Sequence, residues 1–169
     1  MNIQLRPLTS EDKNWFIQSL QHSFKQAVLL ELAADDEIIS REEIEASMNS
    51  ETAESLVIIA DGEKVGGAVV QIYPETQRNS LDLFFVQTGQ ESKGIGLAAW
   101  QAIERSYPQT RVWETHTPYF EKRNIHFYVN KCGFKITEFY HAKHRHNETI
   151  VQDENPLLEE LFKFEKVMK

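Results

Sequence analysis

The 169-residue chain contains little cysteine and comparatively few basic residues. Its one cysteine, Cys132, cannot form an intramolecular disulfide or a thiolate metal cluster, which fits a reducing, cytoplasmic setting. We also expect no metal site, because His141, His144 and His146 cluster without a nearby cysteine or well-placed carboxylate. The 18 Lys and Arg residues are outnumbered by 26 Asp and Glu residues, which gives a formal net charge of −8. This balance argues against a nucleic-acid or anionic-membrane partner, because phosphate-rich surfaces select basic faces.

Long apolar runs are also absent. No run approaches the roughly 20 residues needed to span a bilayer, and the N-terminus lacks the apolar segment of a secretory signal. Apolar residues still make up 41% of the chain, which is enough for a sizeable core. We therefore expect a soluble protein that folds as one domain over residues 1–169.

The spacing of the apolar residues changes several times along the chain. Ser40 with Glu43 three residues later has the arrangement of a capping box, and Asp61-Gly62 between two β-prone runs predicts a hairpin. Alternating runs predict strands at 3–5, 56–60, 64–73, 81–86, 111–115, 134–140 and 161–168. Helical spacing predicts helices at 11–33, 40–49, 93–106 and 121–131. The order of these elements predicts a mixed α/β domain.

A glycine-containing turn, Lys93-Gly94-Ile95-Gly96, joins a predicted strand to a predicted helix. Glycines at the start of a helix let backbone N–H groups approach a phosphate, and the positive end of the helix dipole lies behind them. The turn lacks the third glycine of a dinucleotide fingerprint and the Gly-Lys-Ser/Thr of a P-loop. Taken alone, it does not choose between a nucleotide and coenzyme A.

Two segments in order favour coenzyme A. Leu83 to Val86, followed after four residues by Glu91 to Gly96, resembles the acyl-CoA motif of the GNAT superfamily of N-acetyltransferases. About 30 residues later, Asn124 to Tyr128 and then Lys131 to Phe134 are similar to a second motif of that family, an aromatic-Tyr pair on a helix before Gly-Phe. The two ends of the chain also look like the ends of the family's domain. The resemblance implies a mostly antiparallel central sheet flanked by helices, whose fourth and fifth strands splay apart to admit acyl-CoA.

The resemblance also implies which residues contact the cofactor. Main-chain groups of Phe85 and Val86 are expected to meet the pantetheine and the acetyl group. The pyrophosphate is expected on the loop formed by Glu91, Ser92, Lys93, Gly94, Ile95, Gly96 and Leu97. The second motif adds Asn124, Phe127 and Lys131, and for Phe127 the alternative is a role in the core.

This sequence departs from the family's pattern at three places. Glu91 stands where the family usually has Gln or Arg, so we expect it to act through its main chain if at all. Glu121 stands where many members carry a pantetheine-binding asparagine, which Asn124 would replace one helical turn later. The spacing from Tyr128 to Gly133 is one residue longer than in the commonest version.

By resemblance, the activity is transfer of an acetyl group from acetyl-CoA to a primary amine in a direct ternary complex. The Val86 N–H is our candidate donor to the developing oxyanion, since such donors contribute about 2.7–4 kcal/mol. Tyr128 is the candidate general acid, and its alternative is an aromatic residue packed on the sheet. The competing function is a non-catalytic acyl-CoA-binding or sensory domain on the same scaffold.

The general base is left open among three residues and an ordered water. Asp82 lies four residues before Val86 and is therefore expected on the same face of the strand. Glu114 and His116 lie on the next strand, and His116 has an ordinary pKa near neutrality. For each of these three residues, the alternative to a catalytic role is that of a solvated polar group at the end of the sheet. The segment from Phe24 to Ser50 is where the family shapes its acceptor site, for a small-molecule or peptide amine, and a homodimer is possible.

Overall fold

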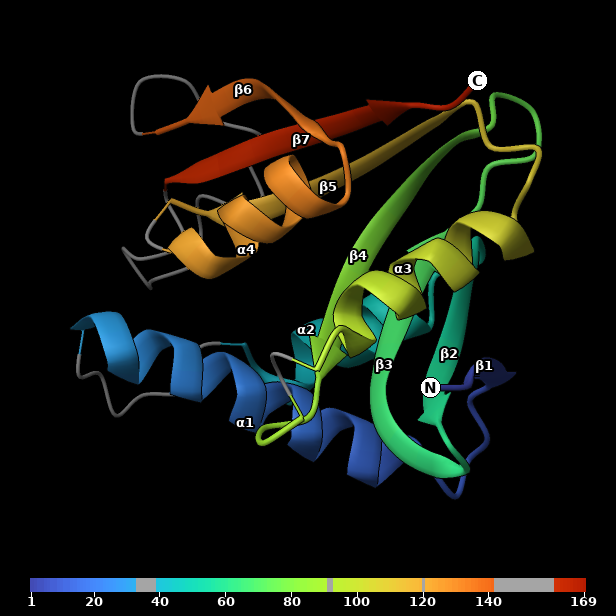
Figure 1. Ribbon diagram of the computed structural model, residues 1–169, viewed down its shortest axis with the longest axis vertical. Coiled ribbons are helices and arrows are strands. Elements are labelled where there is room, and N and C mark those ends of the chain that lie inside the picture. The colour runs from blue at the N-terminus through green and yellow to red at the C-terminus, as the bar shows by residue number, and fades with distance from the viewer. Residues whose placement is uncertain (33–38, 91–92, 120, 142–159) are drawn as a thin grey trace.

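The computed structural model describes residues 1–32, 39–90, 93–119, 121–141 and 160–169. Within these ranges, seven strands form one sheet in the order β1-β2-β3-β4-β5-β7-β6 (Figure 1). They are β1 Ile3–Pro7, β2 Ala53–Ala60, β3 Glu63–Gln71, β4 Arg78–Val86, β5 Val112–Pro118, β6 Lys135–Tyr140 and β7 Leu161–Val167. Neighbouring strands are antiparallel except β4 and β5, which are parallel. The predicted mixed, mostly antiparallel sheet is confirmed.

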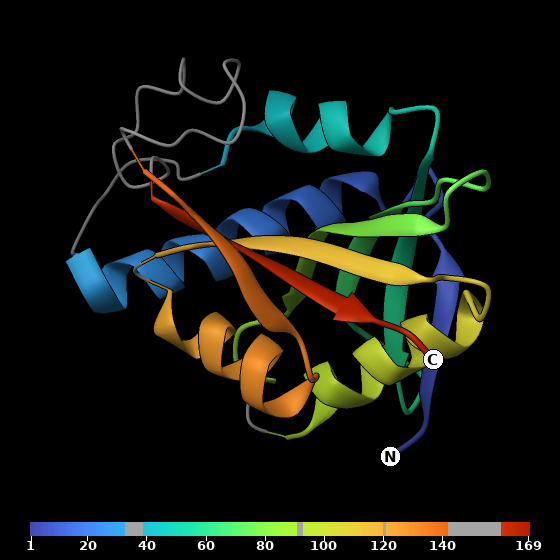
Figure 2. The same ribbon diagram turned by 90° about the horizontal axis from the view of Figure 1, so that it is seen from above.

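Helices cover both faces of this sheet. Seen from above, α1 (Lys13–Leu32) and α2 (Arg41–Met48) lie on one face, and α3 (Ile95–Ser106) and α4 (Lys122–His126) lie on the other (Figure 2). A π-helical turn, η1 (Phe127–Lys131), continues α4. None of the described helices is both long and apolar enough to cross a bilayer.

Two local signals in the sequence have the predicted structural result. Ser40 caps α2: its Oγ accepts a hydrogen bond from the Glu43 amide at 3.1 Å, and the Glu43 side chain accepts one from the Ser40 amide. Asp61 and Gly62 have φ angles of 50° and 87°, as a tight turn between β2 and β3 requires.

A buried carboxylate ties the start of α1 to the sheet. Asp12 is 6% exposed and pairs with Arg6 of β1 at 2.7 Å and with Lys64 of β3 at 3.3 Å. Hydrogen bonding to Arg6 is the main cause that holds the pKa of Asp12 well below its usual range. The Lys64 ammonium also lies 4.5 Å from the centre of the Trp15 ring.

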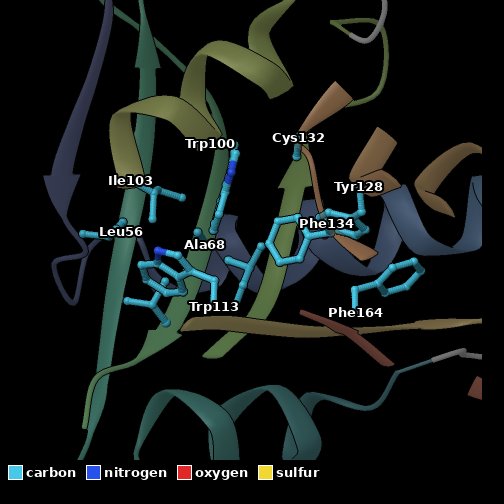
Figure 3. Packing of buried hydrophobic residues seen from close by; sticks show 11 residues of the cluster. Leu56, Ala68, Trp100, Ile103, Trp113, Tyr128, Cys132, Phe134 and Phe164 are labelled. Atoms are coloured by element: carbon cyan, nitrogen blue, oxygen red, sulfur yellow. The ribbon is translucent and has the colours of Figure 1, made fainter. Parts of the chain in front are cut away.

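The core has one large cluster on each side of the sheet. On the α3 and α4 side, aromatic rings pack against one another (Figure 3), with Trp100 and Trp113 in edge contact at 5.2 Å between centroids. On the α1 and α2 side, Phe16 of α1 meets Phe85 of β4 edge to face at 5.2 Å. Gly67 of β3 makes this contact possible, because a Cβ there would overlap the Phe16 ring.

Strand β4 contains a bulge at Asp82. Leu83 pairs with Val69 and Leu81 pairs with Val70, so Asp82 is the extra residue. As a result, Leu81 packs in the α3-side cluster and Leu83 packs in the α1-side cluster, although an unbroken strand would place both on one face.

The same position ends the pairing between the two parallel strands. Leu81 and Thr115 are the last paired residues of β4 and β5. Beyond them β4 runs on to Val86 and β5 to Pro118 without pairing to each other, and the two strands diverge in Figure 1. We call these two unpaired ends, Asp82–Val86 and His116–Pro118, the β4–β5 fork. The splay implied by the resemblance is present, and the bulge accounts for it because bulges bend the strand that carries them.

Candidate active site

The glycine turn leaves the first turn of α3 uncapped by side chains. Gly94 is the N-cap residue, with φ +78°, and no side chain caps the helix. The first intrahelical bond runs from the Ala98 amide to the Gly94 carbonyl at 3.1 Å. The amides of Ile95, Gly96 and Leu97 therefore have no hydrogen-bond acceptor within the helix. The first turn also carries no acidic residue. Such an end suits an anion.

Lys93 adds a positive charge beside this helix end. Its Nζ donates to the Gln90 side chain at 3.3 Å, a weak and exposed contact. Glu91 and Ser92, which were predicted to belong to the same loop, lie outside the described residues. Their roles stay predictions.

One aromatic ring, that of Phe127, lies between the start of α3 and the fork. A Cβ on Gly96 would come within 3.3 Å of the Phe127 ring and 3.8 Å of the Val86 side chain. The Phe127 ring also stacks on Phe84 of β4, with centroids 6.0 Å apart and an interplanar angle of 18°. Phe127 thus joins the glycine turn to the fork as a packing residue, and its contact with the cofactor stays a prediction.

The backbone at the end of β4 alternates between the sheet and the fork. The Gln87 amide donates to the Val65 carbonyl of β3 at 2.6 Å. Because successive residues of a strand point their N–H and C=O groups to opposite sides, Phe85 directs its main chain towards β3, and Phe84 and Val86 direct theirs towards β5. The Phe85 main chain is therefore engaged with β3, whereas the Val86 main chain faces the fork, and the cofactor contacts of both stay predictions.

Tyr128 sits in the π-helical turn. The Cys132 amide donates to the Phe127 carbonyl, five residues earlier, at 2.9 Å. A π turn holds one more residue than an α turn. It absorbs the extra residue between Tyr128 and Gly133, so the helix reaches Gly-Phe despite the longer spacing.

The Tyr128 ring belongs to the core and its hydroxyl faces the fork. The side chain is 5% exposed and packs edge-on against Phe134 at 5.5 Å (Figure 3). Burial raises the pKa of Tyr128, and the Thr115 side chain lowers it only in part. Thr115 is the last β5 residue paired with β4, and its Oγ1 donates to the Leu81 carbonyl at 2.9 Å. A protonated phenol therefore lies where the two strands separate.

A family model described as Acetyltransferase (GNAT) family matches residues 15–134. The chain belongs to the GNAT acetyltransferase family. It is 48% identical over 161 residues to the uncharacterized protein YrkN of Bacillus subtilis, covering 91% of this chain and 87% of YrkN.

Solved structures of GNAT proteins share this fold. An acetyltransferase from Thermus thermophilus superposes with a TM-score of 0.71 at 15% identity, covering 99% of this chain and 98% of that one. A spermidine N-acetyltransferase from Vibrio cholerae, in complex with CoA and spermine, superposes with a TM-score of 0.70 at 11% identity, covering 98% and 95%. Family membership supports acyl transfer as the general chemistry.

The candidate bases of this GNAT domain lie on the sheet face opposite Tyr128. Asp82 accepts hydrogen bonds from Ser47 of α2 at 3.2 Å and from Gln71 of β3 at 2.9 Å. Val86 instead packs with the cluster on the α3 side. The expectation that Asp82 and Val86 share a face is wrong, because the bulge changes the alternation between them.

Trp113 and Thr115 of β5 face α3 and α4. Because side chains alternate along a strand, Glu114 and His116 point to the opposite side, which is also the side of Asp82. Glu114 pairs with Arg78 at 2.7 Å and with Lys163 at 3.6 Å, so cations already balance its charge. The half-buried His116 ring lies 6.1 Å from the Tyr140 ring.

The remaining predicted residues lie on α4 and η1. Asn124 is half-buried on α4, Lys131 is exposed at the end of η1, and Glu121 is buried at the start of α4. Two residues at the fork were not predicted, Phe84 and Gln71. The bulge hides the orientation of Phe84, but Gln71 had a visible signal as the one polar residue in the otherwise apolar run from Val65 to Ile72.

Proposed function

We propose that this chain is an N-acetyltransferase that transfers the acetyl group of acetyl-CoA to a primary amine in a direct ternary complex. The arrangement at the β4–β5 fork carries the proposal. An uncapped helix end and a protonated Tyr128 lie on one face of the sheet, and Asp82 and His116 lie on the other. A thioester donor and an amine acceptor could therefore approach from opposite faces and meet between the strands.

The first turn of α3 is suited to hold the pyrophosphate of acetyl-CoA. The residues fit such a group: Gly94 takes a left-handed conformation that favours glycine, and apart from Met1 at 4.0 Å a Cβ there would meet open space. The amides from Ile95 to Leu97 supply donors, and Lys93 supplies charge. Asn124, Phe127 and Lys131 are proposed as further cofactor contacts, together with Glu91 and Ser92.

The backbone of β4 is suited to stabilise negative charge. The cosubstrate, when bound, supplies an activated thioester whose carbonyl oxygen gains charge as the amine attacks. The Val86 N–H faces the fork and would donate to that oxygen, which in comparable sites contributes about 2.7–4 kcal/mol. The carbon–nitrogen bond forms as the carbon–sulfur bond breaks.

Tyr128 would return a proton to the departing sulfur. Because burial raises its pKa, the phenol keeps its proton throughout the neutral range. The amine acceptor must lose protons before and during attack, and Asp82, His116 or an ordered water would take them. Glu114 is the weakest of the three side-chain candidates, because Arg78 and Lys163 already pair with it.

The proposed acceptor is a small-molecule or peptide amine, and the proposed enzyme acts as one domain over residues 1–169 in the cytoplasm. Its acceptor would lie between the fork and the segment from Phe24 to Ser50, whose Ser47 contacts Asp82. The Vibrio cholerae neighbour bound to CoA and spermine supports including polyamines among the acceptors to be tried.

The test is incubation of the purified chain with acetyl-CoA and a panel of polyamines, monoamines, amino acids and peptides. Released thiol is followed by absorbance and the acetylated product by mass. We expect one thiol per acetylated amine. Tight CoA binding by calorimetry with no acetylated product from any amine would instead support the sensory-domain alternative.

A further inference from the structure

A buried amide holds the carboxylate at the bulge. Gln71 of β3 is 4% exposed, and its Nε2 donates to Asp82 Oδ2 at 2.9 Å and to the Ser47 carbonyl at 3.1 Å. Its Oε1 accepts from the Thr52 hydroxyl at 2.6 Å. Both N–H donors and the oxygen of the amide are therefore used, which fixes its orientation.

Asp82 in turn has most of its acceptor positions filled. Oδ2 accepts from Gln71 and from the Ser47 hydroxyl at 3.2 Å, and Oδ1 accepts from the Ser80 hydroxyl at 2.6 Å. A carboxylate offers about four such positions. Three are occupied here, and the remaining one is on Oδ1.

All three donors to Asp82 are neutral. In the part of the chain that the structure describes, no Lys or Arg pairs with this carboxylate, whereas the neighbouring Glu114 has both Arg78 and Lys163. Asp82 is also exposed to solvent. Its position is thus rigid and its negative charge is not neutralised.

The cost of this arrangement indicates that Gln71 does more than fill space. An apolar side chain would continue the apolar run of β3 without requiring partners, whereas a buried amide that loses its partners is destabilising. Gln71 links α2, the turn before β2 and the bulge of β4 at the point where the fork begins.

We propose that Gln71 is a positioning residue that holds the Asp82 carboxylate at the fork, where Asp82 binds the ammonium group of the acceptor. The inference rests on the proposed N-acetyltransferase activity and names the group that recognises its acceptor. An ammonium carries three donors, of which Asp82 Oδ1 accepts one. The same carboxylate then lies beside the nitrogen that must lose a proton.

Two-substrate kinetics of Gln71→Leu test the proposal, with acetyl-CoA and spermidine, or the best amine of the panel if spermidine is not acetylated. We expect the KM for the amine to rise about tenfold, the scale of one charge-assisted hydrogen bond, with the KM for acetyl-CoA within twofold of wild type. In an Asp82→Asn background, Gln71→Leu should raise the KM for the amine by less than a further twofold, because its effect depends on Asp82.

Two variants separate positioning from loss of structure. Thr52→Val removes one bond to Gln71 without touching Asp82, and we expect it to change the amine KM by less than Gln71→Leu does. Gln71→Glu keeps an acceptor for Thr52 but places a like charge beside Asp82, and it tests the site if Gln71→Leu fails to fold. Wild-type turnover with an unchanged amine KM in Gln71→Leu, or fully additive effects with Asp82→Asn, would overturn this inference alone. No wild-type turnover with any amine would overturn the proposed activity and this inference with it.

Discussion

Replacing Tyr128 by phenylalanine removes one oxygen from a ring that stays packed in the core. The ring keeps its contacts with Phe134 at 5.5 Å and with Phe164 at 5.7 Å between centroids. The hydroxyl's neighbour is Thr115, whose own hydrogen bond to Leu81 does not depend on the phenol. We therefore expect the free energy of unfolding to change by no more than about 1 kcal/mol.

Catalysis should change much more than stability does. Loss of a general acid typically lowers kcat by about 10² to 10⁴, which corresponds to roughly 3–5 kcal/mol of transition-state stabilisation. Affinity for CoA and the amine KM should stay near their wild-type values. Because burial raises the pKa of Tyr128, wild-type kcat should also show no decline from Tyr128 ionisation up to about pH 10.

The assay is steady-state acetylation with saturating acetyl-CoA, paired with urea denaturation of both proteins. Tyr107→Phe is a matched control, since that hydroxyl bonds to Glu54 at 3.1 Å beyond the C-terminal end of α3. We expect its kcat to remain within twofold of wild type. A Tyr128→Phe enzyme with kcat within threefold of wild type would refute the assignment and leave Tyr128 as a core residue only.

Three further predictions concern the fold around the site. Gly67→Ala should lower the free energy of unfolding by about 1–3 kcal/mol in denaturation, because the new methyl group overlaps Phe16; an unchanged value would mean that α1 is not held at that position. Asp12→Asn should lower it by about 1–2 kcal/mol at pH 7, since Arg6 and Lys64 lose their carboxylate partner but are exposed enough to be hydrated. The pKa of Asp12 is lowered in the folded state, so this contribution is present above the ordinary carboxylate pKa of about 4, and the difference between variant and wild type should shrink between pH 5 and pH 2 in the same assay. Deleting Asn130 should leave a protein that is folded by circular dichroism, because the π turn can close as an α turn. Deleting Gln101 from α3 should abolish folding, because it rotates the buried residues that follow it in the helix. If both deletions were tolerated equally, this interpretation of η1 would be contradicted.

Much of the fold could be predicted from the sequence because it follows from local patterns. The capping box at Ser40, the hairpin at Asp61-Gly62 and the glycine turn before α3 each depend on a few neighbouring residues, and the structure contains all three. Apolar periodicity likewise indicated each strand of the described sheet to within a few residues.

The site was less predictable because it depends on irregularities of pairing. The bulge at Asp82 arises where β4 pairs with β3, and no residue type or spacing in β4 indicates it. It reverses the alternation that would place Asp82 with Val86, and a simple strand pattern therefore gives the wrong face. The π turn is similar: the sequence showed one extra residue before Gly133, but not that hydrogen bonding within η1 would absorb it.

A crystal structure of the chain with CoA bound would show whether the fork and the first turn of α3 form one acyl-CoA site. We expect the pyrophosphate within hydrogen-bonding distance of the amides from Ile95 to Leu97, and the sulfur between β4 and β5 on the side of Tyr128. CoA bound away from the first turn of α3, or a fork closed by pairing between β4 and β5, would contradict it.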